Sequence, residues 1–260
     1  MADGFVLYEG PSRFDNRAVV VIATGFRRKS ENTKTGNLVQ TWVLSRDKHP
    51  GLATQLGTDG TVCGACPLRP RRGGGNGGCY VNVNWASATA WNYYQAGAYP
   101  VLNLRTRRAA ELLAGRQVRF GAYGDPAAVP TRLWAQLHRL ARRTVGYSHA
   151  WRSCDPELRQ YCIASVETTI DALVAQSAGW RTFRIRLPWE SLEPNEIACP
   201  AAAESGTRLT CETCMACWGA DSKPRRSVAI QIHGPRNKVV AYTNSARQAK
   251  LPLDYPFEEV

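Results

Sequence analysis

Seven of the nine cysteines lie in two groups whose spacing suits metal binding. The larger group has four members within nineteen residues, Cys199, Cys211, Cys214 and Cys217, and its last three are each separated by two residues. Such spacing turns successive thiolates toward a common centre, as a tetrahedral metal ion or an iron–sulfur cluster requires. Zinc usually pairs two separate two-cysteine knuckles, so this run favours an iron–sulfur cluster of the [4Fe-4S] type. Zinc held by three of these thiolates and His233 is the alternative.

The second group has only three members, which are Cys63, Cys66 and Cys79. A centre held by three thiolates keeps one position open to a small molecule, which is what an enzyme needs. The alternative is a closed structural site, completed by His49, Asp59 or a cysteine from elsewhere in the chain. Glycine-rich sequence before Cys79 excludes a helix interior, where each glycine costs about 1 kcal/mol relative to alanine. We interpret the remaining two cysteines, Cys154 and Cys162, as ordinary buried or half-buried thiols.

Polar, titratable residues follow several of the apolar stretches that we predict to be strands. They are Asp125, His149, Glu167 and His233. Because loops after parallel strands gather the chemistry of βα folds, these four residues predict a catalytic pocket in which a carboxylate and an imidazole move a proton. We expect both cysteine groups to open onto the same rim. Taken singly, each residue also has a structural explanation as a turn, a helix cap or a satisfied core histidine.

Strands and helices alternate regularly from residue 117 onward. The predicted strands are 117–123, 144–149, 161–166, 181–187 and 227–233, with helices at 130–143 and 168–178. In the second of these helices we expect Ile170, Leu173 and Val174 to face inward. Shorter helices are predicted at 85–97 and 106–114. Such alternation is typical of parallel βα units, so we predict an α/β fold, a complete or partial (β/α) barrel with two cysteine-rich metal-binding loops.

The N-terminal part lacks this alternation. Its β-branched and aromatic residues predict strands at 18–26 and 39–46, and the intervening Thr35-Gly36-Asn37 has the chemistry of a turn. We therefore divide the chain into an N-terminal β-hairpin extension (1–50), a cysteine-rich barrel-like domain (51–240) and a C-terminal tail (241–260).

The net charge of +12 comes from 33 Lys and Arg against 21 Asp and Glu. A field of this sign attracts polyanions, so Arg71, Arg72, Arg107 and Arg108 are candidate contacts for a nucleic acid or nucleotide. An arginine-rich proteome is the alternative explanation. We see no leader segment and no apolar run of the roughly 20 residues that a membrane span needs. Clustered cysteines in odd number argue against a disulfide framework, and we expect a cytoplasmic protein without membrane contact.

Motifs between about residues 60 and 235 together resemble an uncharacterised cysteine-rich family of bacteriophage proteins. They are Cys63-x-x-Cys66-Pro67-Leu68, Cys79-Tyr80, Gly124-Asp125-Pro126, Tyr147-Ser148-His149-Ala150-Trp151, Ala164-Ser165-Val166-Glu167, and Cys199 to Cys217 with Trp218-Gly219 and His233-Gly234. That family distantly resembles radical S-adenosylmethionine enzymes, which use a βα barrel and a three-cysteine [4Fe-4S] cluster. Their usual cysteine spacing is Cys-x3-Cys-x2-Cys, whereas here it is Cys-x2-Cys-x12-Cys.

The resemblance implies a catalytic cluster on the three-cysteine group and an auxiliary cluster on the four-cysteine group. It also implies S-adenosylmethionine near Tyr80, Gly124 and Asp125, and a location in the host cytoplasm if the protein is phage-encoded. The leading hypothesis is thus a radical S-adenosylmethionine-like enzyme that acts on a nucleotide or nucleic acid, as in DNA modification. A redox partner is compatible with this hypothesis. One alternative is a non-enzymatic iron–sulfur or zinc protein that binds nucleic acid. Another is a zinc-containing barrel transglycosylase with Asp125 or Glu167 as nucleophile.

Overall fold

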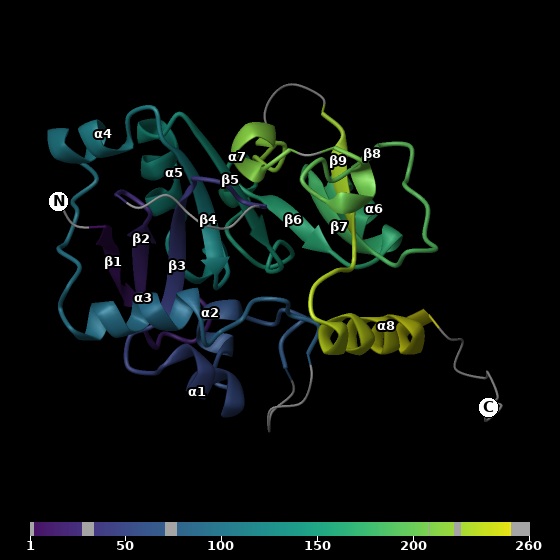
Figure 1. The fold of residues 1–260 in the computed structure, drawn as a ribbon, viewed down its shortest axis with the longest axis horizontal. Coiled ribbons are helices and arrows are strands. Elements are labelled where there is room, and N and C mark those ends of the chain that lie inside the picture. Colours follow the sequence, from purple (N-terminus) through teal and green to yellow (C-terminus); the bar gives the residue numbers. More distant parts are fainter. Residues whose placement is uncertain (1–2, 28–33, 71–76, 208, 221–224, 251–260) are drawn as a thin grey trace.

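The computed structural model describes residues 3–27, 34–70, 77–207, 209–220 and 225–250. Nine strands in these ranges form one sheet: β1 (Gly4–Pro11), β2 (Ala18–Thr24), β3 (Val39–Ser45), β4 (Gln117–Tyr123), β5 (Arg143–Ser148), β6 (Ile163–Val166), β7 (Thr182–Arg186), β8 (Glu196–Ala198) and β9 (Ser227–Gln231). Their order across the sheet is β1-β2-β3-β4-β5-β6-β7-β9-β8 (Figure 1). All pairings from β3 onward are parallel, so the predicted α/β class is confirmed.

The sheet is open, with β1 and β8 at its two edges, so a complete barrel is not formed. The N-terminal hairpin is present, because β2 and β3 pair antiparallel. It is not separate from the βα units, however, since β3 pairs in parallel with β4. All but one of the seven residues of β3 are buried, as expected of a strand inside a sheet that is covered on both faces. The unpredicted strand β1 extends the sheet beyond the hairpin.

Eight α-helices accompany the sheet in the described residues: α1 (Pro50–Gln55), α2 (Gly60–Cys63), α3 (Ala86–Gln95), α4 (Arg107–Leu113), α5 (Thr131–Leu140), α6 (Thr169–Ser177), α7 (Cys211–Cys214) and α8 (Arg236–Lys250). None of them is long and apolar enough to cross a membrane. Figure 1 shows α1, α2 and α3 near one end of the strands and α7 near the other.

Helices α5 and α6 cover one face of the sheet, in contact with β5, β6 and β7. Helix α5 buries Leu133, Trp134 and Leu137, as its 3.6-residue periodicity predicts. The orientation predicted for α6 is wrong, because Ile170 and Leu173 are exposed whereas Ala172 and Ala175 are buried. Apolar residues occur all around this helix, and the small alanine side chains allow its axis to lie closer to the sheet.

The opposite face, which we call the pocket face, carries the side chains of Val145, Phe183, Ile185 and Ile230. Members of both cysteine groups pack into the same apolar cluster on this face. Helix α8 returns to it as well, where the Tyr242 hydroxyl donates a 2.8 Å hydrogen bond to the carbonyl of Ile185. The expected boundary at residues 240 and 241 therefore falls inside a helix that packs on the sheet.

Candidate functional site

The first cysteine group lies on a tight turn at the end of α2. Cys63 is the last residue of this helix, and Gly64 follows with φ of 57°, a left-handed conformation that favours glycine. The Cys66 amide donates to the carbonyl of Cys63 at 3.2 Å, and the Cys79 amide donates to that of Leu68 at 2.8 Å. These backbone bonds bring Cys79 to the same side of the turn as Cys63 and Cys66.

A partly buried ion pair between Arg69 and Asp59 stabilises this turn. Arg69 Nη2 lies 2.6 Å from Asp59 Oδ1, and its guanidinium also donates to the carbonyls of Gly57 and Gly64. His49 accepts a hydrogen bond from the amide of Gly51 and so caps α1. The two residues considered as a fourth ligand, Asp59 and His49, thus have structural partners of their own.

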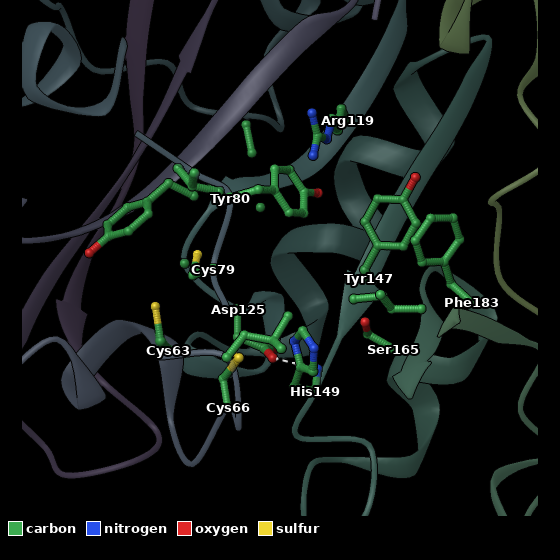
Figure 2. A pocket seen from close by; sticks show the side chains of 17 residues that line it. Cys63, Cys66, Cys79, Tyr80, Arg119, Asp125, Tyr147, His149, Ser165 and Phe183 are labelled. Atoms are coloured by element: carbon green, nitrogen blue, oxygen red, sulfur yellow. Dashed lines mark hydrogen bonds between the residues drawn. The ribbon is translucent and has the colours of Figure 1, made fainter. Parts of the chain in front are cut away.

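The three cysteines line one pocket together with residues from the ends of β4, β5 and β6. Figure 2 shows their sulfur atoms around a common space, with Asp125 and His149 on one side and Tyr80 and Arg119 above. Burial raises the pKa of the Cys63 thiol well above its ordinary value, and the neighbouring Cys79 and Cys66 add to this shift. Both effects favour the protonated form of the Cys63 thiol when no metal is bound.

Asp125 is a buried acceptor that joins β4 to β5. Its carboxylate accepts hydrogen bonds from the amides of Ala127, His149 and Ala150 and from the hydroxyl of Ser148, at 2.8–3.3 Å. Burial raises the pKa of Asp125, and the hydrogen bonds from Ala127 and Ser148 offset part of this effect. Because a carboxylate has about four acceptor positions, it is saturated by the protein itself. This arrangement suits a positioning residue more than a nucleophile.

His149 is in direct contact with the first cysteine group. Its Nε2 lies 3.0 Å from Glu167 Oε1, and its ring is in hydrogen-bonding contact with Cys66. Burial alone would lower the pKa of His149, but the contacts with Cys66 and Glu167 outweigh it and raise the pKa well above the ordinary value. The contacts with Cys66 and Glu167 thus favour the protonated imidazole of His149, next to the pocket that Asp125 orders.

The arrangement of the side chains can be compared with what a single metal ion and a larger cluster each require. Within the described part of the chain, no three His, Cys, Asp or Glu side chains converge closely enough for one metal ion. Thiolates around a single zinc ion each lie about 2.3 Å from it and hence close to one another. An iron–sulfur cluster is a larger body, and it holds its thiolates further apart. The three cysteines of the first group thus share one pocket, and the described residues form no ready-made site for a single metal ion.

The second cysteine group lies in a segment that folds around the short helix α7. Thr210 and Thr213 form a capping box at its start, and Met215 ends it in a left-handed conformation with φ of 48°. Cys199, Cys211, Cys214 and Cys217 line one small pocket beside Tyr147. Burial raises the pKa of Cys217 to about 12, while a hydrogen bond with Tyr147 acts in the opposite direction.

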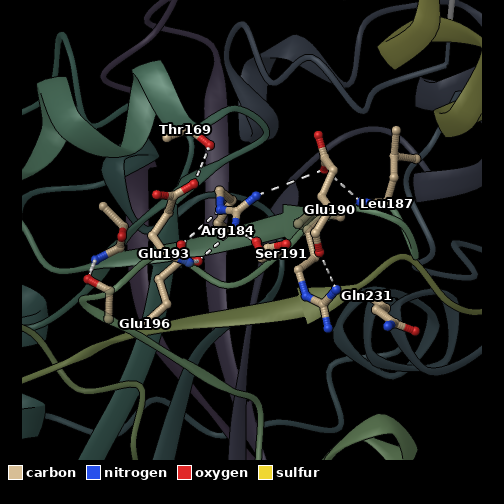
Figure 3. Close-up of polar contacts among 12 residues, drawn as sticks. Thr169, Arg184, Leu187, Glu190, Ser191, Glu193, Glu196 and Gln231 are labelled. Atoms are coloured by element: carbon tan, nitrogen blue, oxygen red, sulfur yellow. Dashed lines mark hydrogen bonds and ion pairs between the residues drawn. The ribbon is translucent and has the colours of Figure 1, made fainter.

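A buried ion pair fixes the position of strand β8, which directly precedes Cys199. Arg184 on β7 forms two hydrogen bonds of 2.8 and 2.7 Å with the carboxylate of Glu196 on β8, and both side chains are almost fully buried (Figure 3). The same carboxylate accepts from the amide of Glu193. Strand β8 ends one residue before Cys199, so this network fixes the position of one ligand candidate.

The two groups share a sheet face, but the Cys211–Cys217 segment does not lie at the rim of the first group. The first group lies with the residues that follow β4, β5 and β6. The second lies toward the start of β4, where the Gln117 side chain donates to the carbonyl of Glu212, and its Cys217 carbonyl accepts from the amide of Gly146. The Cys211–Cys217 segment thus departs from the expected common rim, whereas Cys199 directly follows the end of the parallel strand β8. Tyr147 lines the pockets of both groups and is the side chain between them.

The other predicted site residues have varied surroundings. His233 does not line the pocket of Asp125 and His149, and its Nε2 is 2.6 Å from Lys34 Nζ. Tyr80 lines the first pocket, and its ring is 5.9 Å from that of His233. Gly124 has φ of 77°, and a Cβ there would lie 2.5 Å from the carbonyl oxygen of Val43. Packing against β3 thus explains this glycine without a ligand.

Of the four arginines proposed to contact nucleic acid, the structure describes two, and neither lines the pocket. Arg107 and Arg108 lie on α4, which Figure 1 places near the β1 end of the sheet. Arg107 pairs with Glu111 on the surface, and Arg108 lies 5.7 Å from the ring centroid of Phe5. Arg71 and Arg72 lie outside the described residues.

Sequence reasoning missed Lys34, Arg119 and Tyr147, which all line the space between the cysteine groups. Arg119 could have been found, because a charged residue in the middle of an otherwise apolar strand needs a partner or a function. Lys34 gave no such signal, since it lies in a polar turn far from the site in sequence.

Comparison with known proteins adds no family to this description. No family model, no curated protein and no solved structure matches the chain.

Proposed function

We propose that this protein is an iron–sulfur enzyme in which Cys63, Cys66 and Cys79 hold a [4Fe-4S] cluster with one open iron. The observation that carries the proposal is the pocket in which these three thiols meet Asp125 and His149 at the ends of parallel strands. Loops at these ends are where α/β folds of this kind bind and transform their ligands. In this proposal Cys199, Cys211, Cys214 and Cys217 hold a second, fully ligated cluster.

When bound, the three-cysteine cluster would supply one-electron chemistry and an open coordination position. The protein's own groups would then orient the reacting molecule. His149 is held by Glu167 and by the hydrogen bond from its backbone amide to Asp125, so its ring presents a proton beside Cys66. Tyr123, with its buried ring in the pocket wall, and the apolar residues of the pocket face exclude water. His149 is therefore the proposed acid, and Glu167 and Asp125 position it.

The resemblance to radical S-adenosylmethionine enzymes names the molecule to test at the open iron. Tyr80 and the Gly124-Asp125 turn border the same pocket as the three cysteines. Asp125 would have to exchange one of its present hydrogen bonds to accept a ligand amino group, because its acceptor positions are occupied. Tyr80 is half exposed and has more freedom to contact such a ligand.

Two alternatives are less well supported. A transglycosylase needs an accessible carboxylate nucleophile, whereas Asp125 is saturated and Glu167 is paired with His149. A purely nucleic-acid-binding protein would gather its arginines on one face. Of the arginines, Arg107 and Arg108 are on α4 while Arg119 lines the internal pocket.

Electron paramagnetic resonance of the reduced, cluster-loaded protein tests the open iron directly. S-adenosylmethionine should change the signal of the wild type and of a Cys214→Ala variant, whose three-cysteine group is intact. The same addition should leave the signal of a Cys66→Ala variant unchanged. A loaded wild-type protein whose signal is the same with and without S-adenosylmethionine would contradict the assignment of this cofactor to the open site.

A further inference from the structure

A second cavity lies between the two cysteine groups, on the pocket face. Its polar and aromatic lining includes Lys34, Arg119, His233, Tyr80, Tyr147 and Phe183, and Cys199 and Cys211 border it. The cavity volume is about 200 Å³, well above the roughly 10–15 Å³ that one water needs on the same measure. It shares Tyr80, Arg119 and Tyr147 with the pocket of the first group, so the two spaces adjoin.

The lining of this cavity is basic. Three of its side chains are cationic or can become so, and no Asp or Glu of the described chain belongs to the lining. Glu204 lies in the adjoining opening, but its carboxylate pairs with Arg186. An internal space with only basic groups attracts an anion, and low surrounding polarity strengthens the attraction.

Arg119 differs from Arg69, Arg184 and Arg186 in its partners. Arg69, Arg184 and Arg186 each form an ion pair with a carboxylate. No ion pair joins Arg119 to a carboxylate within the described residues; its guanidinium contacts Tyr80 and lies 5.9 Å from the ring centroid of Tyr147. A guanidinium is suited to two parallel hydrogen bonds with phosphate or carboxylate oxygens. Lys34, whose Nζ lies 2.6 Å from His233, provides a second positive group on the same cavity.

Aromatic rings line the side of the cavity that adjoins the first cysteine group. Tyr147 and Phe183 have their ring centroids 4.7 Å apart, and Tyr80 lies beside Arg119 (Figure 2). Stacking of a base on an aromatic side chain contributes about 1–3 kcal/mol. Basic groups next to such rings suit a ligand that has both a phosphate and a planar base.

We propose that the cavity binds a nucleoside monophosphate, with its phosphate at Lys34 and Arg119 and its base at Tyr80 and Tyr147. This inference deepens the proposed function, on which it rests for the role of the ligand as substrate. A nucleotide in this position would extend from the second cysteine group toward the pocket of the first. The cavity is present in the cluster-free chain, so the binding itself can be measured separately from cluster loading.

Lys34 and Arg119 could also serve a different role, which is to balance the charge of a cluster on the second cysteine group. Lys34 and Arg119 are also close enough to Cys211 to interact with it electrostatically. If they served only to balance the negative charge of a cluster on the second group, their loss would lower iron and sulfide content, and nucleotides would not bind.

The experiment is equilibrium dialysis of the full chain, cluster-free and cluster-loaded, against the four ribonucleoside and the four deoxyribonucleoside monophosphates. The matching nucleosides and inorganic phosphate are the partial ligands. The variants are Arg119→Gln and Lys34→Gln, with Arg132→Gln, an exposed residue of α5, as the charge-matched control. We expect at least one monophosphate to bind, and Arg119→Gln and Lys34→Gln to weaken this binding about 10-fold or more, because each removes a charged hydrogen bond. Arg132→Gln should bind as the wild type does.

Three outcomes would overturn the proposal: no monophosphate binds, a nucleoside binds as well as its monophosphate, or both pocket variants bind as tightly as the control. If Arg119→Gln does not fold, Lys34→Gln and the comparison of nucleoside with monophosphate in the wild type still decide the question. Failure of the proposed function has a different signature, since a chain without iron could still bind the nucleotide through these residues.

Discussion

His149 Nε2 lies 3.0 Å from a carboxylate oxygen of Glu167, and the same imidazole contacts the thiol of Cys66. Both side chains of the His149–Glu167 pair are about one-fifth exposed, at 19% and 21%. The pair links the residues that follow β5 and β6 to the first cysteine group, and it determines the protonation of the one histidine in that pocket.

Replacing Glu167 with Gln should lower the pKa of His149, because the amide does not stabilise the imidazolium as the carboxylate does. In the cluster-free protein the pKa of His149 is raised in the folded state, so the pair stabilises the fold fully below the unfolded value of about 6.5. This stabilisation is lost as the pH rises through the folded pKa. Near pH 6 the wild type should be about 1–2 kcal/mol more stable than the variant. Urea unfolding at several pH values and a histidine NMR titration measure both effects; an unchanged His149 titration would contradict the pairing.

Glu196→Gln tests the buried network that positions Cys199. Removing the Glu196 charge leaves buried Arg184 with the more distant Glu190 carboxylate, at 3.9 Å, and the loss of a buried partner typically destabilises a protein by about 3–5 kcal/mol. Glu111→Gln is the matched control, because its partner Arg107 is on the surface, and it should have little effect. The free energies of unfolding come from urea titrations. Equal stability of the two variants would mean that the Arg184–Glu196 pair does not hold β8.

The two cysteine groups should respond differently to substitution. Cys214→Ser should reduce the yield of soluble protein, because a fully ligated centre adds its binding free energy to the folding free energy. Cys66→Ser should have a milder effect on folding, since its group is proposed to be open. Soluble yield and melting temperature after anaerobic purification provide the comparison. Similar losses in both variants would indicate that both centres are structural.

Cluster loading should release protons. Burial raises the pKa values of Cys63, Cys79, Cys199 and Cys211, and it raises that of Cys217 to about 12. These thiols are thus protonated at neutral pH in the cluster-free chain, and each must lose its proton to become a ligand. Loading in weakly buffered solution should therefore acidify the medium, and the loaded centre should be retained less well as the pH falls. Loading that is independent of pH would show that these cysteines are not the ligands.

The sequence was sufficient for much of the α/β alternation, because strands such as 117–123 and 181–187 place apolar residues at alternate positions and are bounded by turn residues. It was insufficient for sheet closure, which depends on whether the two edge strands meet and not on any local pattern. The orientation of α6 was mispredicted because large and small apolar residues occupy different faces, and packing selected the alanines.

The candidate site was predictable in part for the same reason. Asp125, His149 and Glu167 each follow a strand, so parallel neighbours bring them together. Lys34 and Arg119 meet only through long-range packing of the N-terminal turn against the second cysteine segment, where the Cys211 amide donates to the carbonyl of Lys34. No periodicity in the sequence encodes that contact.

The most direct test of the central claim is the iron and acid-labile sulfide content of protein purified without oxygen. Two [4Fe-4S] clusters predict about eight iron and eight sulfide per chain, with visible absorption. Alanine at Cys63, Cys66 and Cys79 together, or at the four cysteines of the second group, should each remove about half of the iron and sulfide. A colourless protein with stoichiometric zinc and no sulfide would contradict the account.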